Sequence, residues 1–218
     1  MRTPLAAMLI GGTAILVGGL GATSSFASSG QPWTVTPAGQ GMATTATVTL
    51  SDPVTGGAMS CADGNARSND DQDEWSVGWS NGPIYNPHAF GLVNEMTYAP
   101  CVSPAGGPAV LTGTALPWKL HGASYLASSG VTHGTVKGVR LTLDGDGCSA
   151  FIESASATAP GTVKFTYTNG PATLRLLPTG GNLEFSGVSG CSGLFNDGDP
   201  AAITASFTTD PAQTITRA

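Results

Sequence analysis

The sequence predicts an all-β protein, a sandwich or barrel of roughly ten strands with two disulfide bonds. Three observations predict it. Short runs alternate apolar and polar residues with the period of two that a half-buried strand requires. Turn signals rich in Gly, Asp, Asn and Pro separate these runs at nearly every interval. Apart from a short helical turn expected after Pro87, no segment shows the 3.6-residue apolar period of an amphipathic helix.

The first residues have the three-part pattern of a secretory signal peptide. Arg2 precedes an apolar run from Leu5 to Ala22, and a site with small residues ends at Ala27. We expect cleavage after Ala27, which makes residues 1–27 the signal peptide and residues 28–218 a secreted β domain with no stable membrane insertion. The alternative is an uncleaved anchor, because the apolar run approaches the roughly 18–20 residues that a spanning helix needs.

The expected strands follow from period-two alternation. In residues 162–168, Val163, Phe165 and Tyr167 share one face while polar residues occupy the other. Asn169-Gly170 then predicts a hairpin connection to the next strand. The strands expected in this way, in chain order, cover residues 44–50, 109–115, 118–125, 138–145, 162–168, 173–177, 183–188 and 202–209.

Four cysteines in an exported chain indicate two disulfides. A zinc site is the alternative, but zinc ligands usually come as close C-x-x-C pairs, which this chain lacks. Two segments repeat the order of strand, Asp/Gly turn and Cys, which predicts duplicated halves at residues 33–116 and 117–218. The duplication favours the pairs Cys61–Cys101 and Cys148–Cys191; chance similarity in a Thr/Gly-rich chain is the alternative.

Several short motifs support a family resemblance. They are "WTVTP" after the leader, "LPWKL" in the middle, paired "GC" motifs and "GDPA" near the end. With them the chain resembles secreted actinobacterial proteins of unassigned function that have two disulfides. The resemblance covers most of the mature chain and implies an exported β protein, but it implies no catalytic residue.

The composition limits the partners. Charged residues make up only 10% of the chain, against about 25% in typical globular proteins. The formal net charge is −6, and no run of Lys or Arg occurs. Because phosphate neutralisation supplies most nucleic-acid affinity, we expect no nucleic-acid partner. A carbohydrate or a cell-envelope polymer is the expected partner, and no cofactor is expected.

The sequence contains no recognisable catalytic motif. It has no G-x-S-x-G, and the histidines have no metal-binding spacing. We therefore predict no catalytic residue and a non-enzymatic protein. The alternative is a secreted glycoside hydrolase that uses two carboxylates, for which the candidate glutamates are Glu74, Glu95, Glu153 and Glu184.

Acidic turns make weak calcium candidates. Calcium requires several hard oxygen ligands from one or two loops. If Cys148 and Cys191 are bonded, the loops beside them could converge and bring together Asp144, Asp146, Asn196, Asp197 and Asp199. The alternative is that Asp and Asn beside Gly only form tight turns.

The stretch "SNDDQDEWSVGW", residues 68–79, is the candidate binding segment. In an extended chain Trp75 and Trp79 share one face, and carboxylates lie beside them. Sugar rings stack on such aromatic faces, so the predicted binding residues are Asp73, Glu74, Trp75, Trp79 and Tyr85. The alternative is that these tryptophans lie in the core. The sequence thus predicts a secreted or cell-surface binding module for an envelope or extracellular polymer.

Overall fold

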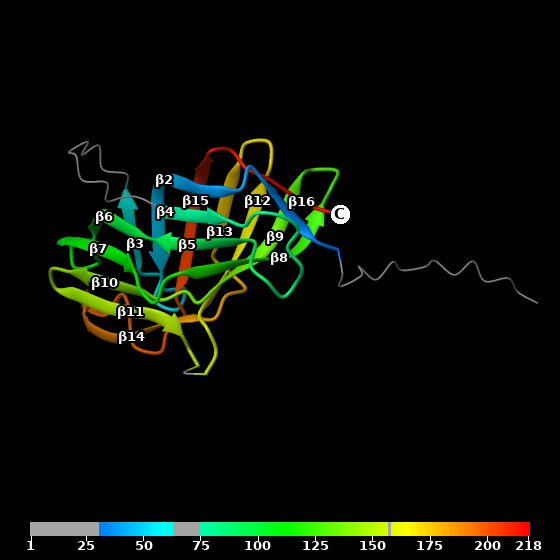
Figure 1. Ribbon diagram of the computed structural model, residues 1–218. Coiled ribbons are helices and arrows are strands. Elements are labelled where there is room, and N and C mark those ends of the chain that lie inside the picture. The colour runs from blue at the N-terminus through cyan, green and yellow to red at the C-terminus, as the bar shows by residue number, and fades with distance from the viewer. Residues whose placement is uncertain (1–30, 63–74, 157) are drawn as a thin grey trace, which may run out of the picture.

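The computed structural model describes residues 31–62, 75–156 and 158–218, whose regular secondary structure is almost wholly β-strand (Figure 1). The all-β prediction is confirmed. The described part contains sixteen strands, more than the sequence predicts. The predicted signal peptide and residues 63–74 lie outside the described residues.

The strands and one 3-10 turn follow one another along the described residues. In order they are β1 (Trp33–Thr36), β2 (Gly39–Ser51), β3 (Ala58–Ala62), β4 (Trp75–Trp79), β5 (Gly91–Glu95), β6 (Thr97–Val102), β7 (Pro108–Gly113), β8 (Trp118–Leu126), β9 (Val131–Lys137), β10 (Leu141–Gly145), β11 (Cys148–Ser154), β12 (Thr162–Thr168), β13 (Thr173–Leu177), β14 (Leu183–Gly190), η1 (Cys191–Gly193), β15 (Ala202–Asp210) and β16 (Thr214–Arg217).

Eight strands close a barrel in the order β2-β15-β13-β12-β9-β8-β5-β4. The barrel closes because β2 is long enough to have two neighbours along one edge. Its residues 39–43 pair with β4, and its residues 47–51 pair with β3. Its other edge pairs with β15. Closure leaves these barrel strands without an open edge, where another chain could otherwise add a strand.

Six of the remaining strands form a second layer that continues from β2 in the order β3-β6-β7-β10-β11-β14 (Figure 1). The outer edge of β14 is bonded to residues 198–201, which lead directly into β15. The N–H of Phe185 donates to the carbonyl of Asp199 at 2.9 Å, and the N–H of Ala201 donates to the carbonyl of Leu183 at 2.9 Å. The second layer therefore returns to a strand of the barrel.

Both disulfides lie in the second layer, and both predicted pairings are confirmed. Cys61–Cys101 joins β3 to β6, and Cys148–Cys191 joins β11 to η1, which directly follows β14. The first predicted half supplies β2, β3, β6 and β7 to this region, and the second supplies β10, β11, β14 and the approach to β15. A duplicated unit would give each half the same sequence of paired strands, as is found here. The duplication itself stays a prediction.

A ribbon formed by β1 and β16 joins the two ends of the described chain and packs Trp33, Val35 and Ile215 into the core. The hairpin predicted at Asn169-Gly170 is confirmed between β12 and β13. The Asn169 side chain is bonded to the ribbon, because its amide donates to the carbonyl of Ile215 at 2.9 Å and its oxygen accepts from the N–H of Ile215 at 2.8 Å.

Aromatic side chains fill the barrel interior. Ring centroids lie 5.6 Å apart for Trp33 and Phe90, 6.3 Å for Trp79 and Phe90, and 6.0 Å for Trp79 and Tyr167. The Tyr167 hydroxyl donates to the carbonyl of Gln213 at 2.8 Å. Burial raises the pKa of Tyr167, and its hydrogen bonds partly oppose that shift. The interior is thus a packed core, so a ligand would have to bind the outside of the barrel.

Two glycines make room for these rings. Gly122 on β8 and Gly134 on β9 lie directly opposite each other. A Cβ at Gly122 would overlap the indole of Trp33, and a Cβ at Gly134 would overlap the ring of Phe165. Because these two paired residues have no side chain, the rings of Trp33 and Phe165 can lie directly against the backbone of β8 and β9, which only glycine allows.

The prediction of a helical turn after Pro87 is wrong. The N–H of His88 donates to the carbonyl of Tyr85 at 2.9 Å, so the one turn found here includes Pro87 rather than following it. Strand β5 then begins at Gly91. Phe90 and Val93 are buried in the barrel. The apolar residues of this segment belong to a strand because β4 and β8 supply backbone partners on both of its edges.

Candidate functional site

The predicted aromatic platform does not form around Trp79. The Trp79 side chain is only 4% exposed and packs among the core rings, so it has no free face for a sugar, and the core alternative is confirmed for this residue. Tyr85 is 51% exposed and lies in the loop before β5. Asp73 and Glu74 lie outside the described residues, and only the backbone of Trp75 is described.

Two of the acidic calcium candidates, Asp197 and Asp199, have structural partners. The Asp197 carboxylate accepts the N–H of Val188 at 2.8 Å, and the Asn196 amide donates to the Asp199 carboxylate at 3.0 Å. Within residues 31–62, 75–156 and 158–218, no three His, Cys, Asp or Glu side chains lie close enough to hold a metal ion. The described part of the chain therefore does not bring Asp144 and Asp146 together with the other loop as a set of metal ligands.

Two of the candidate glutamates are neighbours. Glu153 and Glu184 are directly opposed on β11 and β14. The Glu153 carboxylate lies 2.9 Å from Nε of Arg140 and accepts the Ser186 hydroxyl at 2.9 Å. The two side chains stand next to each other on one sheet face, whereas a hydrolase needs carboxyl groups on opposite sides of the scissile bond. Glu95 ends β5, and Glu74 lies outside the described residues.

The outside of four neighbouring barrel strands carries exposed positive side chains. Each alternates along its strand with buried core residues, so each points outward. We call this set the cation line; its members are Lys119 on β8, Lys137 on β9, Lys164 on β12 and Arg175 on β13.

Strand register sets the spacing of the cation line. Lys119 and Lys137 are directly opposed. Lys164 and then Arg175 are each displaced by one strand and two residues from the preceding cation. Directly opposed side chains are about 5 Å apart and diagonal neighbours about 7–8 Å apart. The four cations therefore form one diagonal row across β8, β9, β12 and β13, strands that are neighbours in the barrel (Figure 1).

No carboxylate lies among these strands. The sequences of β8, β9, β12, β13 and of the two hairpin turns contain neither Asp nor Glu. In the described part of the chain no residue of the cation line forms a salt bridge; the ion pair found there joins Arg140 to Glu153 on the second layer. Since directly opposed like charges destabilise a sheet, Lys119 and Lys137 leave an uncompensated positive charge on the surface.

Two histidines lie on the same outer face. His121 on β8 is opposite Thr135, and His133 on β9 is opposite Thr166, so both stand beside the cation line. Partial burial lowers the pKa of His121, and the charges of Lys137 and Lys119 lower it further. The same positive field that acts on His121 would attract an anion from solvent.

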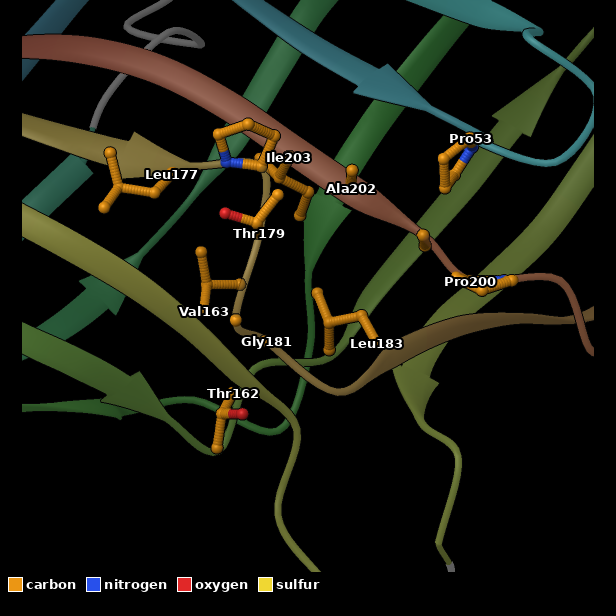
Figure 2. A pocket seen from close by; sticks show the side chains of 13 residues that line it. Pro53, Thr162, Val163, Leu177, Thr179, Gly181, Leu183, Pro200, Ala202 and Ile203 are labelled. Atoms are coloured by element: carbon orange, nitrogen blue, oxygen red, sulfur yellow. The ribbon is translucent and has the colours of Figure 1, made fainter.

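An uncharged hollow with a volume of about 240 Å³ flanks the cation line (Figure 2). It lies where β13 ends at Leu177 and the chain turns back towards β14. Its floor is apolar, and Thr179 stands near the middle of the view. The side chains that define it are Pro53, Thr162, Val163, Pro178, Thr179, Leu183, Pro200 and Ile203.

Comparison with known proteins gives no family assignment. No family model, no curated protein and no solved structure matches this chain. Among the described residues, no helix is long and apolar enough to cross a membrane. The two disulfides fit an extracellular protein.

Sequence reasoning missed the cation line. Its members are far apart in the chain and become neighbours only through strand pairing. A usable signal was present, because each cation occupies an outward position of an alternating strand that has no acidic residue. The hollow left no sequence signal beyond the turn residues of "LPTGG".

Proposed function

We propose that this protein is a secreted, non-enzymatic β-barrel module that binds a linear anionic polymer of the cell envelope or extracellular space. The observation that carries the proposal is the cation line, four exposed cations in one diagonal row with no carboxylate on their strands. A row matches a chain of repeating anionic groups better than it matches a small compact anion, because each cation can meet a different group of one polymer.

Charge complementarity supports this partner. The chain has a formal net charge of −6, yet the four strands of the cation line contain neither Asp nor Glu, whereas β10, β11 and β14 each carry a carboxylate. Such separation guides an anion to one wall while the rest of the surface repels it. The Lys164 ammonium donates to the Thr135 hydroxyl at 3.0 Å, which leaves further donors for a ligand.

Removing one cation from the line should weaken polymer binding. We expect Lys137→Gln to lower the affinity for polygalacturonate about fivefold at low salt, since one Lys beside an anionic surface contributes about 1 kcal/mol. The double variant Lys119→Gln/Lys137→Gln should lose about tenfold or more. Affinity electrophoresis or titration calorimetry at pH 7.5 measures both values.

Arg140→Gln is the matched control. Arg140 lies three positions after Lys137 in the sequence. Its replacement also removes one positive charge, but this charge belongs to the ion pair with Glu153 and not to the cation line. Its affinity should stay within about twofold of the wild-type value. Equal losses for Lys137→Gln and Arg140→Gln, or no binding of polygalacturonate by the wild-type protein at low salt, would contradict the proposed function.

Binding should also strengthen as the pH falls. The pKa of His121 is lowered, so its positive charge is gained only below the ordinary pKa of about 6.5, while polymer carboxylates stay ionised above pH 5. The charged groups around it are Lys119, Lys137 and, more weakly, His88. Affinity measured from pH 7.5 to 5 should rise steadily, and His121→Gln should flatten part of that rise; a falling affinity would refute the electrostatic basis of binding.

A further inference from the structure

The hollow beside the cation line has a floor of buried apolar side chains and a rim of prolines. Val163, Leu183 and Ile203 are buried beneath it, whereas Pro178 and Pro200 are exposed at its edge (Figure 2). It exists because β13 ends at Leu177 while β12 and β15 continue on either side. The hollow is thus a gap in the barrel wall that the turn at residues 178–181 only partly covers.

Strand register places the hollow next to two members of the cation line. Thr162, which lines the hollow, is the pairing partner of Lys137, and Leu177, which also lines it, is the pairing partner of Lys164. The Lys164 side chain also runs past the turn, since a Cβ at Gly180 would lie 3.1 Å from Cγ of Lys164. A polymer that follows the cation line from Lys137 to Lys164 therefore passes the rim.

The chemistry of the hollow complements that of the line. Among the described residues no charged side chain lines it, and it contributes apolar surface together with the Thr179 hydroxyl and the backbone of Gly180 and Gly181. Apolar walls with a few polar groups are typical of sites for small uncharged groups. A volume of about 240 Å³ is below the roughly 300–1,000 Å³ of pockets for drug-sized ligands, so it suits a single ring.

We infer that the hollow binds one sugar ring of the polymer, which makes the ligand an acidic polysaccharide. This inference rests on the proposed function, because the hollow selects among polymers that the cation line attracts. An inorganic polyphosphate has no ring to place there. Single-stranded nucleic acid is less suited, because its bases stack on aromatic or Arg side chains and neither type lines the hollow.

Filling the hollow tests the inference. Thr179 is exposed, and its side chain stands in the hollow, so Thr179→Tyr should occupy the space without disturbing the core. We expect this variant to bind polygalacturonate about tenfold more weakly, which corresponds to the loss of about 55 Å² of buried apolar surface. Its affinity for linear polyphosphate should stay within about twofold. Ser128→Tyr, which adds the same ring to the exposed β8–β9 turn, should change neither affinity.

The two probes distinguish failure of this inference from failure of the proposed function. If Thr179→Tyr leaves polygalacturonate binding unchanged, or weakens both probes equally, the sugar site is refuted. If Lys137→Gln fails to weaken either probe, the cation line is not the binding site and the proposed function fails as well. Tighter binding of single-stranded DNA than of polygalacturonate by the wild-type protein would also overturn the inference, because it would show that the cation line and the hollow prefer a nucleic acid to a polysaccharide.

Discussion

Trp33→Ala is expected to destabilise the protein by about 3–5 kcal/mol, the usual cost of removing a fully buried Trp. The Trp33 side chain is 0% exposed, and its ring packs near the Phe90 ring and beneath the Arg217 guanidinium. Its loss would leave a cavity above Gly122 and free the β1–β16 ribbon from the barrel. Urea unfolding followed by tryptophan fluorescence or circular dichroism measures the change.

A double-variant cycle with Gly122 isolates the packing contribution. The three atoms nearest to a Cβ at Gly122 all belong to Trp33. Gly122→Ala should therefore cost about 1–3 kcal/mol by overpacking in the wild-type protein, but much less in the Trp33→Ala background, where the indole is gone. Equal costs in both backgrounds would show that Trp33 does not fill the barrel at this level.

Removing the Cys148–Cys191 disulfide by replacing both residues with Ala is expected to cost about 4 kcal/mol, because the bridge closes a loop with a sequence separation of 43. For a domain of this size, that loss lowers Tm by roughly 8–16 °C. Calorimetry under non-reducing conditions measures it. Replacing both cysteines also avoids leaving a free thiol in the buried layer.

The second disulfide provides the comparison. Cys61–Cys101 has a sequence separation of 40, so its loss should cost nearly the same when loop entropy dominates. Costs that differ by more than about 2 kcal/mol would mean that local packing, rather than the loop closed in the unfolded chain, decides the contribution of each bridge.

Local patterns predicted the strands whose two faces differ most. Residues 162–168 and 173–177 alternate strictly between core and surface, and they match β12 and β13. The segment that contains β4 and β5 was harder, because its glycines weaken the alternation and Pro87 suggested a helical turn. The disulfide pairs could be predicted because the two Cys segments resemble each other.

Features that depend on pairing between distant strands could not be predicted. Barrel closure requires β2 to change partner from β4 to β3 along its length, which no local pattern encodes. The burial of the Trp79 side chain likewise depends on barrel closure, because the ring packs against Phe90 and Tyr167 in the barrel interior. The cation line has the same origin, since the register of four strands places residues far apart in sequence within one row.

The most direct test of the anionic-polymer account is to map binding on the backbone amides by NMR during titration with polygalacturonate at low salt. The account predicts that the largest shift changes fall on β8, β9, β12 and β13 and on the turn at residues 178–181, and that added salt reverses them. Shift changes concentrated on β10, β11 and β14, or no changes at saturating polymer, would contradict it.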